Sequence, residues 1–139
     1  MDPNLISEFN KEIEVAKYLE KVLKDQQEYI DSIQTLSLKI EKVDKEDDSI
    51  NYLKLSCKKR KLLRTYITFL DNSIINEETS RIEKMNKEII GKVKYNFTIL
   101  KENSLKKIEK EDSQLRQLIN INPKIETVTL DYLCKIWGY

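Results

Sequence analysis

The stretch from Ile50 to Ile75, INYLKLSCKKRKLLRTYITFLDNSII, constrains the fold of this chain more than any other part. It contains neither glycine nor proline, and Asp71 is its only acid. Its apolar residues recur mostly at steps of three, four and seven, which is the spacing of one helix face. They are Leu55, Leu62, Leu63, Tyr66, Phe69, Leu70 and Ile74. The pattern predicts a central helix that is apolar on one side and strongly cationic on the other.

The composition of the whole chain also favours helices. Its 139 residues include only two glycines and two prolines, and 35% are charged. Few helix breakers with abundant Lys, Glu, Leu and Ile are typical of long helices. A chain of this length forms one domain with a real core. We therefore expect an all-α fold, with a bundle of three to four helices over residues 1–122 and a short C-terminal segment over 123–139.

The segment before the central helix predicts another long helix. Asp2 followed by Pro3 is a helix-start signal, because a carboxylate can cap the helix and proline suits its first position. Apolar residues then favour helix from about 4 to 40, either continuous or broken near 24–28 or 34–37. The acidic run EKVDKEDDS, 41–49, predicts a solvated loop that caps the central helix through Asp47, Asp48 or Ser49. The alternative is an acidic docking strip.

A third helix is expected from about 77 to 109, starting after the cap Asn76 with two acids in its first turn. Its length would be roughly 45–50 Å. A helix this long on a small domain usually packs against a partner, so we expect a hetero-oligomer and self-association of the isolated chain. We expect residues 109–113 to form a charged hinge or a continued exposed turn. A short helical stretch then ends at Asn120–Pro123.

The tail after Pro123 has two interpretations. Val128, Leu130, Tyr132, Cys134 and Ile136 occupy alternate positions, with Thr127 and Thr129 among them, as in a strand. The same segment also fits one short helix through Leu130, Leu133, Cys134 and Trp137. The alternation favours a strand over residues 126–136.

Residue types that carry catalysis are scarce. The chain has no histidine, and its two glycines, Gly91 and Gly138, cannot form a phosphate-cradling loop. We therefore expect no enzyme activity, no cofactor and no catalytic, cofactor-binding or metal-binding residue. Two distant cysteines, Cys57 and Cys134, suggest reduced thiols inside a cell. No apolar run is long enough to span a bilayer, so we expect no membrane contact. The predicted location is the nucleus, with the cytoplasm as the alternative.

Six of the eleven residues from Lys54 to Arg64 are basic. One interpretation is a cationic helix face matched by acidic groups of the same fold or of a partner. The other is a sequence-independent contact with DNA phosphates, for which Lys54, Lys58, Lys61 and Arg60 could supply free charges. The contact residues that we predict for either partner are Lys54, Lys58, Lys61 and Arg64. A net charge of only +1 favours a protein partner.

The apolar periodicity of the second and third helices also predicts the core. The predicted core residues are Leu62, Leu63, Tyr66, Ile67, Leu70, Ile89, Val93, Phe97 and Leu100.

The segment RKLLRTYI, residues 60–67, resembles the signature helix of GINS subunits, the four-protein replication complex. The resemblance is to the Sld-five and partner-of-Sld-five-one type, whose pattern reads roughly R-x-[LV]-L-x-[ST]-Y-[LI]. An amphipathic segment precedes it and an acid-started helix follows it, as in that family. The family usually has arginines two and four residues after the tyrosine, where this chain has Thr68 and Leu70.

The resemblance implies an all-helical domain paired with paralogous subunits that supports the replicative helicase and polymerase. It also implies that the tail after Pro123 corresponds to the start of a small β-rich domain. The alternative function is a coiled-coil scaffold or tether of the kinetochore or vesicle-tethering kind, built on the 77–109 helix.

Overall fold

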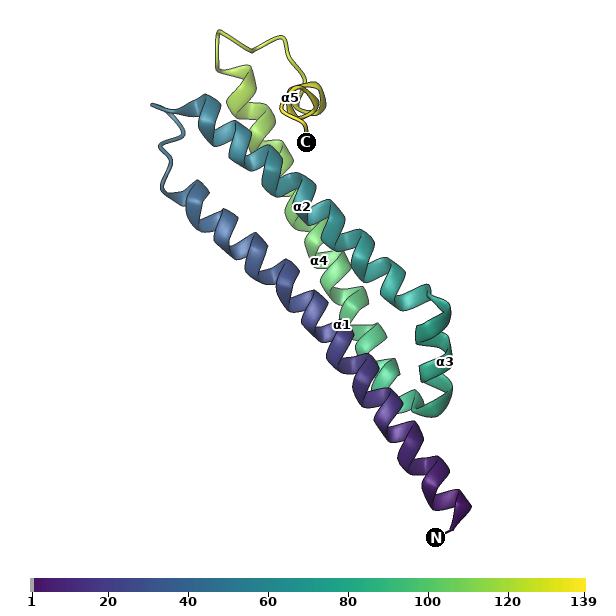
Figure 1. Cartoon of the computed structure of the whole chain (residues 1–139). Helices are drawn as coiled ribbons and strands as arrows, with labels where there is room; N and C mark the ends of the chain where they lie inside the picture. The colour runs from purple at the N-terminus through teal and green to yellow at the C-terminus, as the bar shows by residue number, and fades with distance from the viewer. Residues whose placement is uncertain (1) are drawn as a thin grey trace.

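The computed structural model describes residues 2–139 and contains five helices and no strand within that range (Figure 1). They are α1 (Pro3–Glu41), α2 (Ser49–Ile75), α3 (Glu77–Met85), α4 (Lys87–Asn120) and α5 (Leu130–Ile136). The predicted all-α fold is confirmed.

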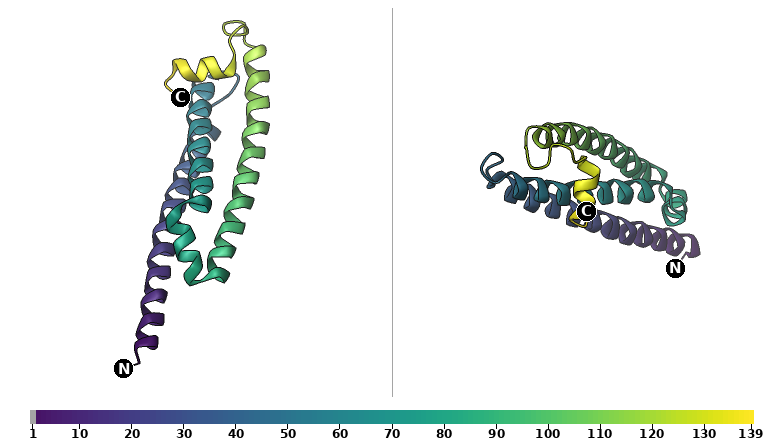
Figure 2. Two further views of the ribbon diagram at one scale, coloured as in Figure 1. Left: turned by 90° about the vertical axis from the view of Figure 1, so that its right-hand side faces the viewer. Right: turned by 90° about the horizontal axis from the view of Figure 1, so that it is seen from above.

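The three long helices lie side by side, with α2 between α1 and α4 (Figure 2). Helix α2 packs against both of them, whereas α1 and α4 do not pack against each other. Short α3 joins α2 to α4 at one end of the molecule, and α5 crosses α2 at the other end (Figures 1 and 2). The N-terminal part of α1 extends beyond all the other helices. The stretch that we took as central is thus central in the fold.

Helix α1 begins where the sequence predicts. The Asp2 carboxylate accepts a hydrogen bond from the backbone N–H of Asn4 at 2.9 Å, and Pro3 occupies the first turn. The helix then continues without a break to Glu41, because its apolar residues keep facing α2 and α3. The breaks considered near 24–28 and 34–37 do not occur.

The acidic loop over residues 42–48 is short and largely exposed to solvent. Asp48 occupies the N-cap position of α2, but its side chain makes no capping hydrogen bond. Asp44 instead accepts hydrogen bonds from the backbone N–H groups of Glu46 at 2.8 Å and Asp47 at 3.0 Å. The bonds from Asp47 and Glu46 lower the pKa of the Asp44 carboxyl. Asp44 therefore orders the loop itself.

The helix predicted over 77–109 begins as expected after Asn76, but it is not continuous and does not end at 109. It is interrupted at Asn86, whose extended backbone ends α3 and whose side chain caps α4 by accepting a hydrogen bond from Ile89 N–H at 3.1 Å. Asparagine favours such caps because its side chain competes for backbone donors. After the interruption Ile90 is fully buried, and Ile89, which we predicted in the core, is 39% exposed.

Helix α4 also runs beyond residue 109 to Asn120, so residues 109–113 form neither a hinge nor a separate turn. The helix continues because Glu111 and Asp112 find basic partners on α2 and because Leu115 and Ile119 are buried. The short stretch predicted near 115–119 is the last part of α4.

The C-terminal segment is a helix, so the favoured strand is wrong. Thr129 caps α5 by accepting a hydrogen bond from the backbone N–H of Tyr132 at 3.2 Å. Helical spacing buries Leu130, Leu133 and Cys134 together, while Tyr132 faces solvent. Burial against α2 and α4 outweighs the strand-like alternation. The described residues therefore contain no beginning of a β-rich domain.

Two hydrophobic clusters hold the helices together. The first lies between α1, α2, α3 and α4; it includes Leu63, Tyr66, Leu70 and Phe97, all predicted in the core. Leu62, Ile67, Val93 and Leu100 are half-buried around it. The second cluster joins α5 to α2 and α4, and consists of Leu53, Cys57, Leu115, Ile119, Leu130, Leu133 and Cys134. The C-terminal segment thus packs onto the helical domain.

Candidate interaction surfaces

The basic run on α2 is divided by the fold into an inner, neutralised part and an outer, exposed part. On the inner side, Lys59 Nζ lies 2.9 Å from Glu111 Oε1 of α4. Arg60, which we counted among the free charges, is buried and paired. No acid on α2 itself neutralises them; the partners come from α4 and α5.

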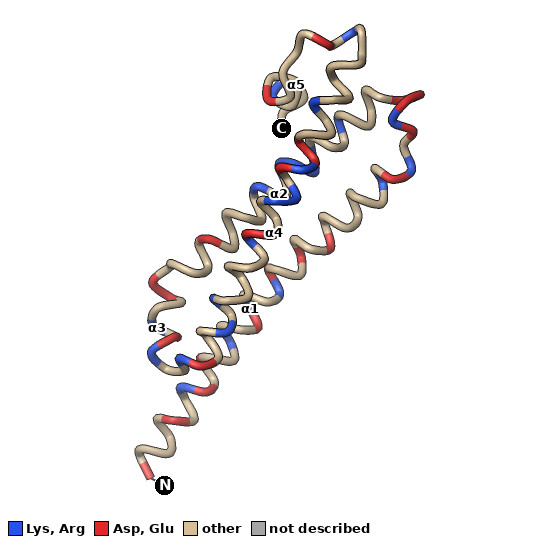
Figure 3. Tube along the Cα trace, turned by 180° about the vertical axis from the view of Figure 1, so that it is seen from behind, with Lys and Arg blue, Asp and Glu red and all other residues tan. Residues whose placement is uncertain are grey.

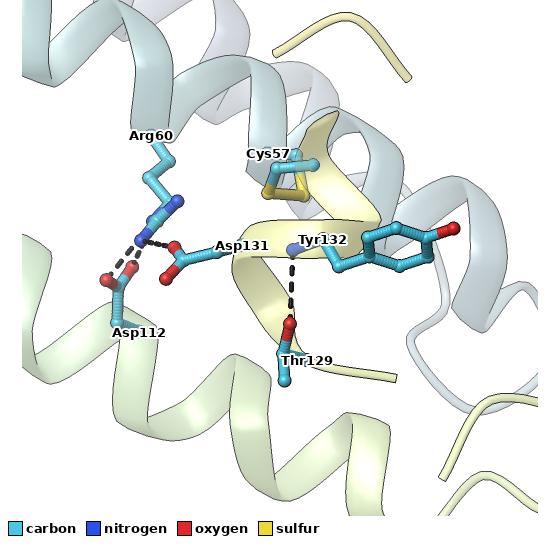
Figure 4. The surroundings of a disulfide bond; sticks show 7 residues. Cys57, Arg60, Asp112, Thr129, Asp131 and Tyr132 are labelled. Carbon is cyan, nitrogen blue, oxygen red and sulfur yellow. Dashed lines mark hydrogen bonds and ion pairs between the residues drawn. A yellow bond between two sulfur atoms is a disulfide. The ribbon is translucent and has the colours of Figure 1, made fainter. Parts of the chain in front are cut away.

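Arg60 ties three helices together (Figure 4). Its Nε donates to both carboxylate oxygens of Asp112 on α4, at 3.0 and 3.1 Å. Its Nη2 donates to Asp131 Oδ1 on α5 at 2.6 Å. Arg60 and Asp112 are both buried, whereas the Asp131 side chain is largely exposed. A buried charge must be paired and hydrogen-bonded, so this arginine serves the fold rather than a partner.

The hydrogen bond from Arg60 to Asp131 changes the acidity of the aspartate. That bond and the charge of Arg60 hold the pKa of the Asp131 carboxyl below its ordinary value, and the charges of Arg64 and Arg116 act in the same direction. The slight burial of Asp131 acts in the opposite direction and raises its pKa. Asp131 is therefore a carboxylate over the whole neutral range.

The outer part of the run forms an exposed surface that we call the basic face. It consists of Lys54, Lys58, Lys61 and Arg64, the four contact residues predicted from the sequence. None of them forms an ion pair with a carboxylate in the described range, 2–139. Lys and Arg accordingly gather on this part of α2, close to α5 (Figure 3). The basic face can attract an anionic partner.

A disulfide joins Cys57 on α2 to Cys134 on α5, so the expectation of two reduced thiols is wrong for this structure (Figure 4). Their Cα atoms lie 5.3 Å apart, within the usual range for a disulfide. The pairing is missed in the sequence because 77 positions separate the two residues.

The first turns of α1 form a second exposed surface, which we call the N-terminal arm, residues 3–13. Its apolar residues Leu5 and Phe9 are 62% and 61% exposed, and Ile6 and Ile13 are also open to solvent. The buried face of α1 begins at Val15 and lies on another side of the helix, and the first ion pair to α3 joins Glu14 to Arg81. The apolar residues of the arm therefore form an exposed stripe of their own.

A groove of about 560 Å³ separates the ends of α1 and α4 over α2. Ile40, Tyr52, Leu115 and Leu118 line it, together with the ion-paired Lys59 and Glu111. The described part of the chain contains no group of three or more His, Cys, Asp or Glu residues that could hold a metal ion. None of its described helices is both long and apolar enough to cross a membrane.

Comparison with protein families, curated proteins and solved structures finds no match to this chain. The resemblance to GINS subunits thus depends on residues 60–67 and their neighbours alone.

Proposed function

We propose that this chain is a non-enzymatic subunit of a multi-protein assembly and that it binds a protein partner through the N-terminal arm. The supporting observation is the arm's uncovered apolar stripe, with Leu5 and Phe9 each more than half exposed. Adjacent exposed apolar side chains mark interaction sites more often than isolated ones do.

The energetics favour a partner for the arm. Burying a Leu or Phe side chain that was exposed contributes about 1.5–3 kcal/mol. A helix end with no tertiary contact also tends to fray, because isolated helical turns are unstable in water. A partner that covers Leu5, Phe9 and Ile13 would therefore stabilise both the stripe and the helix.

The finer proposal is a GINS-like subunit that supports the replicative helicase. It rests on the resemblance of residues 60–67, which lie in the middle of α2, with Tyr66 in the core and Arg60 in a buried ion pair. Such a subunit would act in the nucleus with paralogous helical subunits. The Cys57–Cys134 disulfide counts against that location.

The alternative proposal is a scaffold or tether subunit. The interruption at Asn86 removes the continuous 77–109 helix on which we first based it. The length of α1 and the projection of its arm favour it instead (Figure 1). Burial of Tyr66 and Phe97 in one cluster, however, is what a globular bundle predicts.

The experiment is purification of the tagged chain from its native source, with quantification of associated proteins. The arm variant is Leu5→Gln/Phe9→Gln. The matched control is Ile75→Gln/Ile121→Gln, which alters two other highly exposed apolar residues. We expect the wild type and the control to retain stoichiometric protein partners and the arm variant to lose them without a change in melting temperature. Equal recovery of partners by all three would refute the proposed role of the arm.

A further inference from the structure

We propose that the basic face and α5 together bind single-stranded nucleic acid without reading its sequence. This activity goes beyond the protein-assembly role, because it uses a different surface and a different class of partner. Its evidence is a set of exposed charges on α2 and an exposed aromatic ring on α5, the helix that the disulfide holds against α2.

The charges lie on one stretch of α2. Lys54, Lys58 and Lys61 recur at helical spacing on the side that faces solvent, and Arg64 follows at the flank. From Lys54 to Arg64 the helix rises by about 15 Å. None of these side chains lies within ion-pair distance of a carboxylate in the described part of the chain, although Arg64 is close enough to Asp131 to lower its pKa. We therefore expect them to contact successive phosphates of an extended strand.

Helix α5 adds one exposed aromatic ring, that of Tyr132, and one more charge, that of Lys135. The disulfide fixes α5 on α2, and Lys61 Nζ donates to the carbonyl oxygen of Gly138 at 3.5 Å. Tyr132 is 60% exposed and extends outward from α5 (Figure 4), and Lys135 is exposed one turn later. In the sequence no aromatic residue is interleaved with the basic run, so the exposed ring of Tyr132 on α5 was not considered.

Composition favours nucleic acid over an acidic protein surface. The centres of protein interfaces are depleted in lysine and rich in desolvated apolar groups. Between Lys54 and Thr65 the exposed residues of α2 are instead Lys54, Lys58, Lys61, Arg64 and Thr65, all of them polar. Phosphates need such free Lys and Arg heads, and an exposed Tyr ring offers a stacking surface for a base.

The geometry favours a single strand rather than a duplex read in its groove. Helix α2 is covered by α1 and α4 on two sides and crossed by α5, so it cannot enter a major groove as a recognition helix does. Five cations, the basic face plus Lys135, predict a modest affinity. They also predict that log K falls with log salt concentration at a slope of about −3 to −4.

The experiment is fluorescence anisotropy of a labelled oligothymidylate with the oxidised full chain at several salt concentrations. The test variant is Lys58→Glu/Lys61→Glu. Its control is Lys84→Glu/Lys87→Glu, two exposed lysines without ion pairs at the α3–α4 junction. We expect at least a tenfold loss of affinity in the test variant, a smaller slope, and an effect below threefold in the control. No binding by the wild type, or equal losses in both variants, would refute the proposal.

The role of stacking is tested separately. Tyr132→Ala should weaken binding at least about fivefold, whereas Tyr132→Phe, which keeps the ring, should not. An abasic strand of equal length should bind more weakly than oligothymidylate, and the fluorescence of Trp137, which follows α5, should change on binding. Equal binding of the abasic strand, of duplex DNA or of polyglutamate would overturn the assignment to single-stranded nucleic acid.

Discussion

Arg60 on α2 and Asp112 on α4 form a buried ion pair in which Arg60 Nε contacts both carboxylate oxygens, at 3.0 and 3.1 Å. The two residues lie 52 positions apart and fix the register of α2 against α4. Breaking one side of such a pair leaves a buried charge without a partner, which is strongly destabilising.

We therefore predict that Asp112→Asn lowers the free energy of unfolding by about 3–5 kcal/mol, measured by urea denaturation. The neighbouring Glu111→Gln, which breaks the more exposed pair with Lys59, should cost about 1 kcal/mol or less. Replacing both buried partners by apolar residues, as in Arg60→Met/Asp112→Leu, should recover most of the loss. Equal effects of the two single variants would contradict this account of the pair.

Asp131 predicts a pH dependence of stability. Because Arg60 lowers its pKa in the folded chain, the unfolded chain binds its proton at higher pH than the folded chain does. The stabilisation is present above the ordinary pKa of 3.8 and is lost as pH falls through the lowered value. Wild type should therefore exceed Asp131→Asn in melting temperature near pH 7, and the difference should shrink below about pH 4. A difference that does not change between pH 7 and pH 3 would count against the bond.

The disulfide predicts a redox-dependent stability. It closes a loop spanning 77 positions, for which the chain-entropy model gives about 4.5 kcal/mol. Cys57→Ser/Cys134→Ser should lower the free energy of unfolding by an amount of that order, and reductant should affect only the wild type. Thiol trapping of the chain from its native source should find both cysteines blocked as a disulfide. Two freely alkylated thiols there would show that the bond is not formed in its own compartment.

The interruption at Asn86 predicts opposite roles for two adjacent isoleucines. Ile90 is fully buried, so Ile90→Ala should cost about 2–5 kcal/mol in unfolding free energy. Ile89 is at the surface, so Ile89→Ala should change it by less than about 1 kcal/mol. Thermal and urea unfolding of the two variants provide the comparison. The reverse order of effects would contradict the interruption and support the continuous helix over 77–109 that we expected from the sequence.

Local signals predicted most of the fold and little of the site. The cap at Asp2, the start at Asn76 and the stripe through Leu63, Tyr66 and Leu70 depend on neighbouring residues, and the structure contains them as expected. These features follow from helical spacing and capping alone.

Long-range pairings could not be predicted in this way. Whether Arg60 is free or buried depends on Asp112 and Asp131, and whether Cys57 is a thiol depends on Cys134. The C-terminal segment is helical because Leu130, Leu133 and Cys134 pack against apolar residues of α2 and α4. Each outcome depends on which helices meet, which the spacing within one helix does not specify.

The most direct test of the central claim is hydrogen exchange of the backbone amides of the N-terminal arm, residues 3–13. In the isolated chain these amides should exchange quickly, because no other helix covers them, while those of α2 exchange slowly. In the assembly purified from the native source, the arm should become protected and α2 should not change. An arm that exchanges equally fast in both states would contradict the claim that the chain binds its partner through this segment.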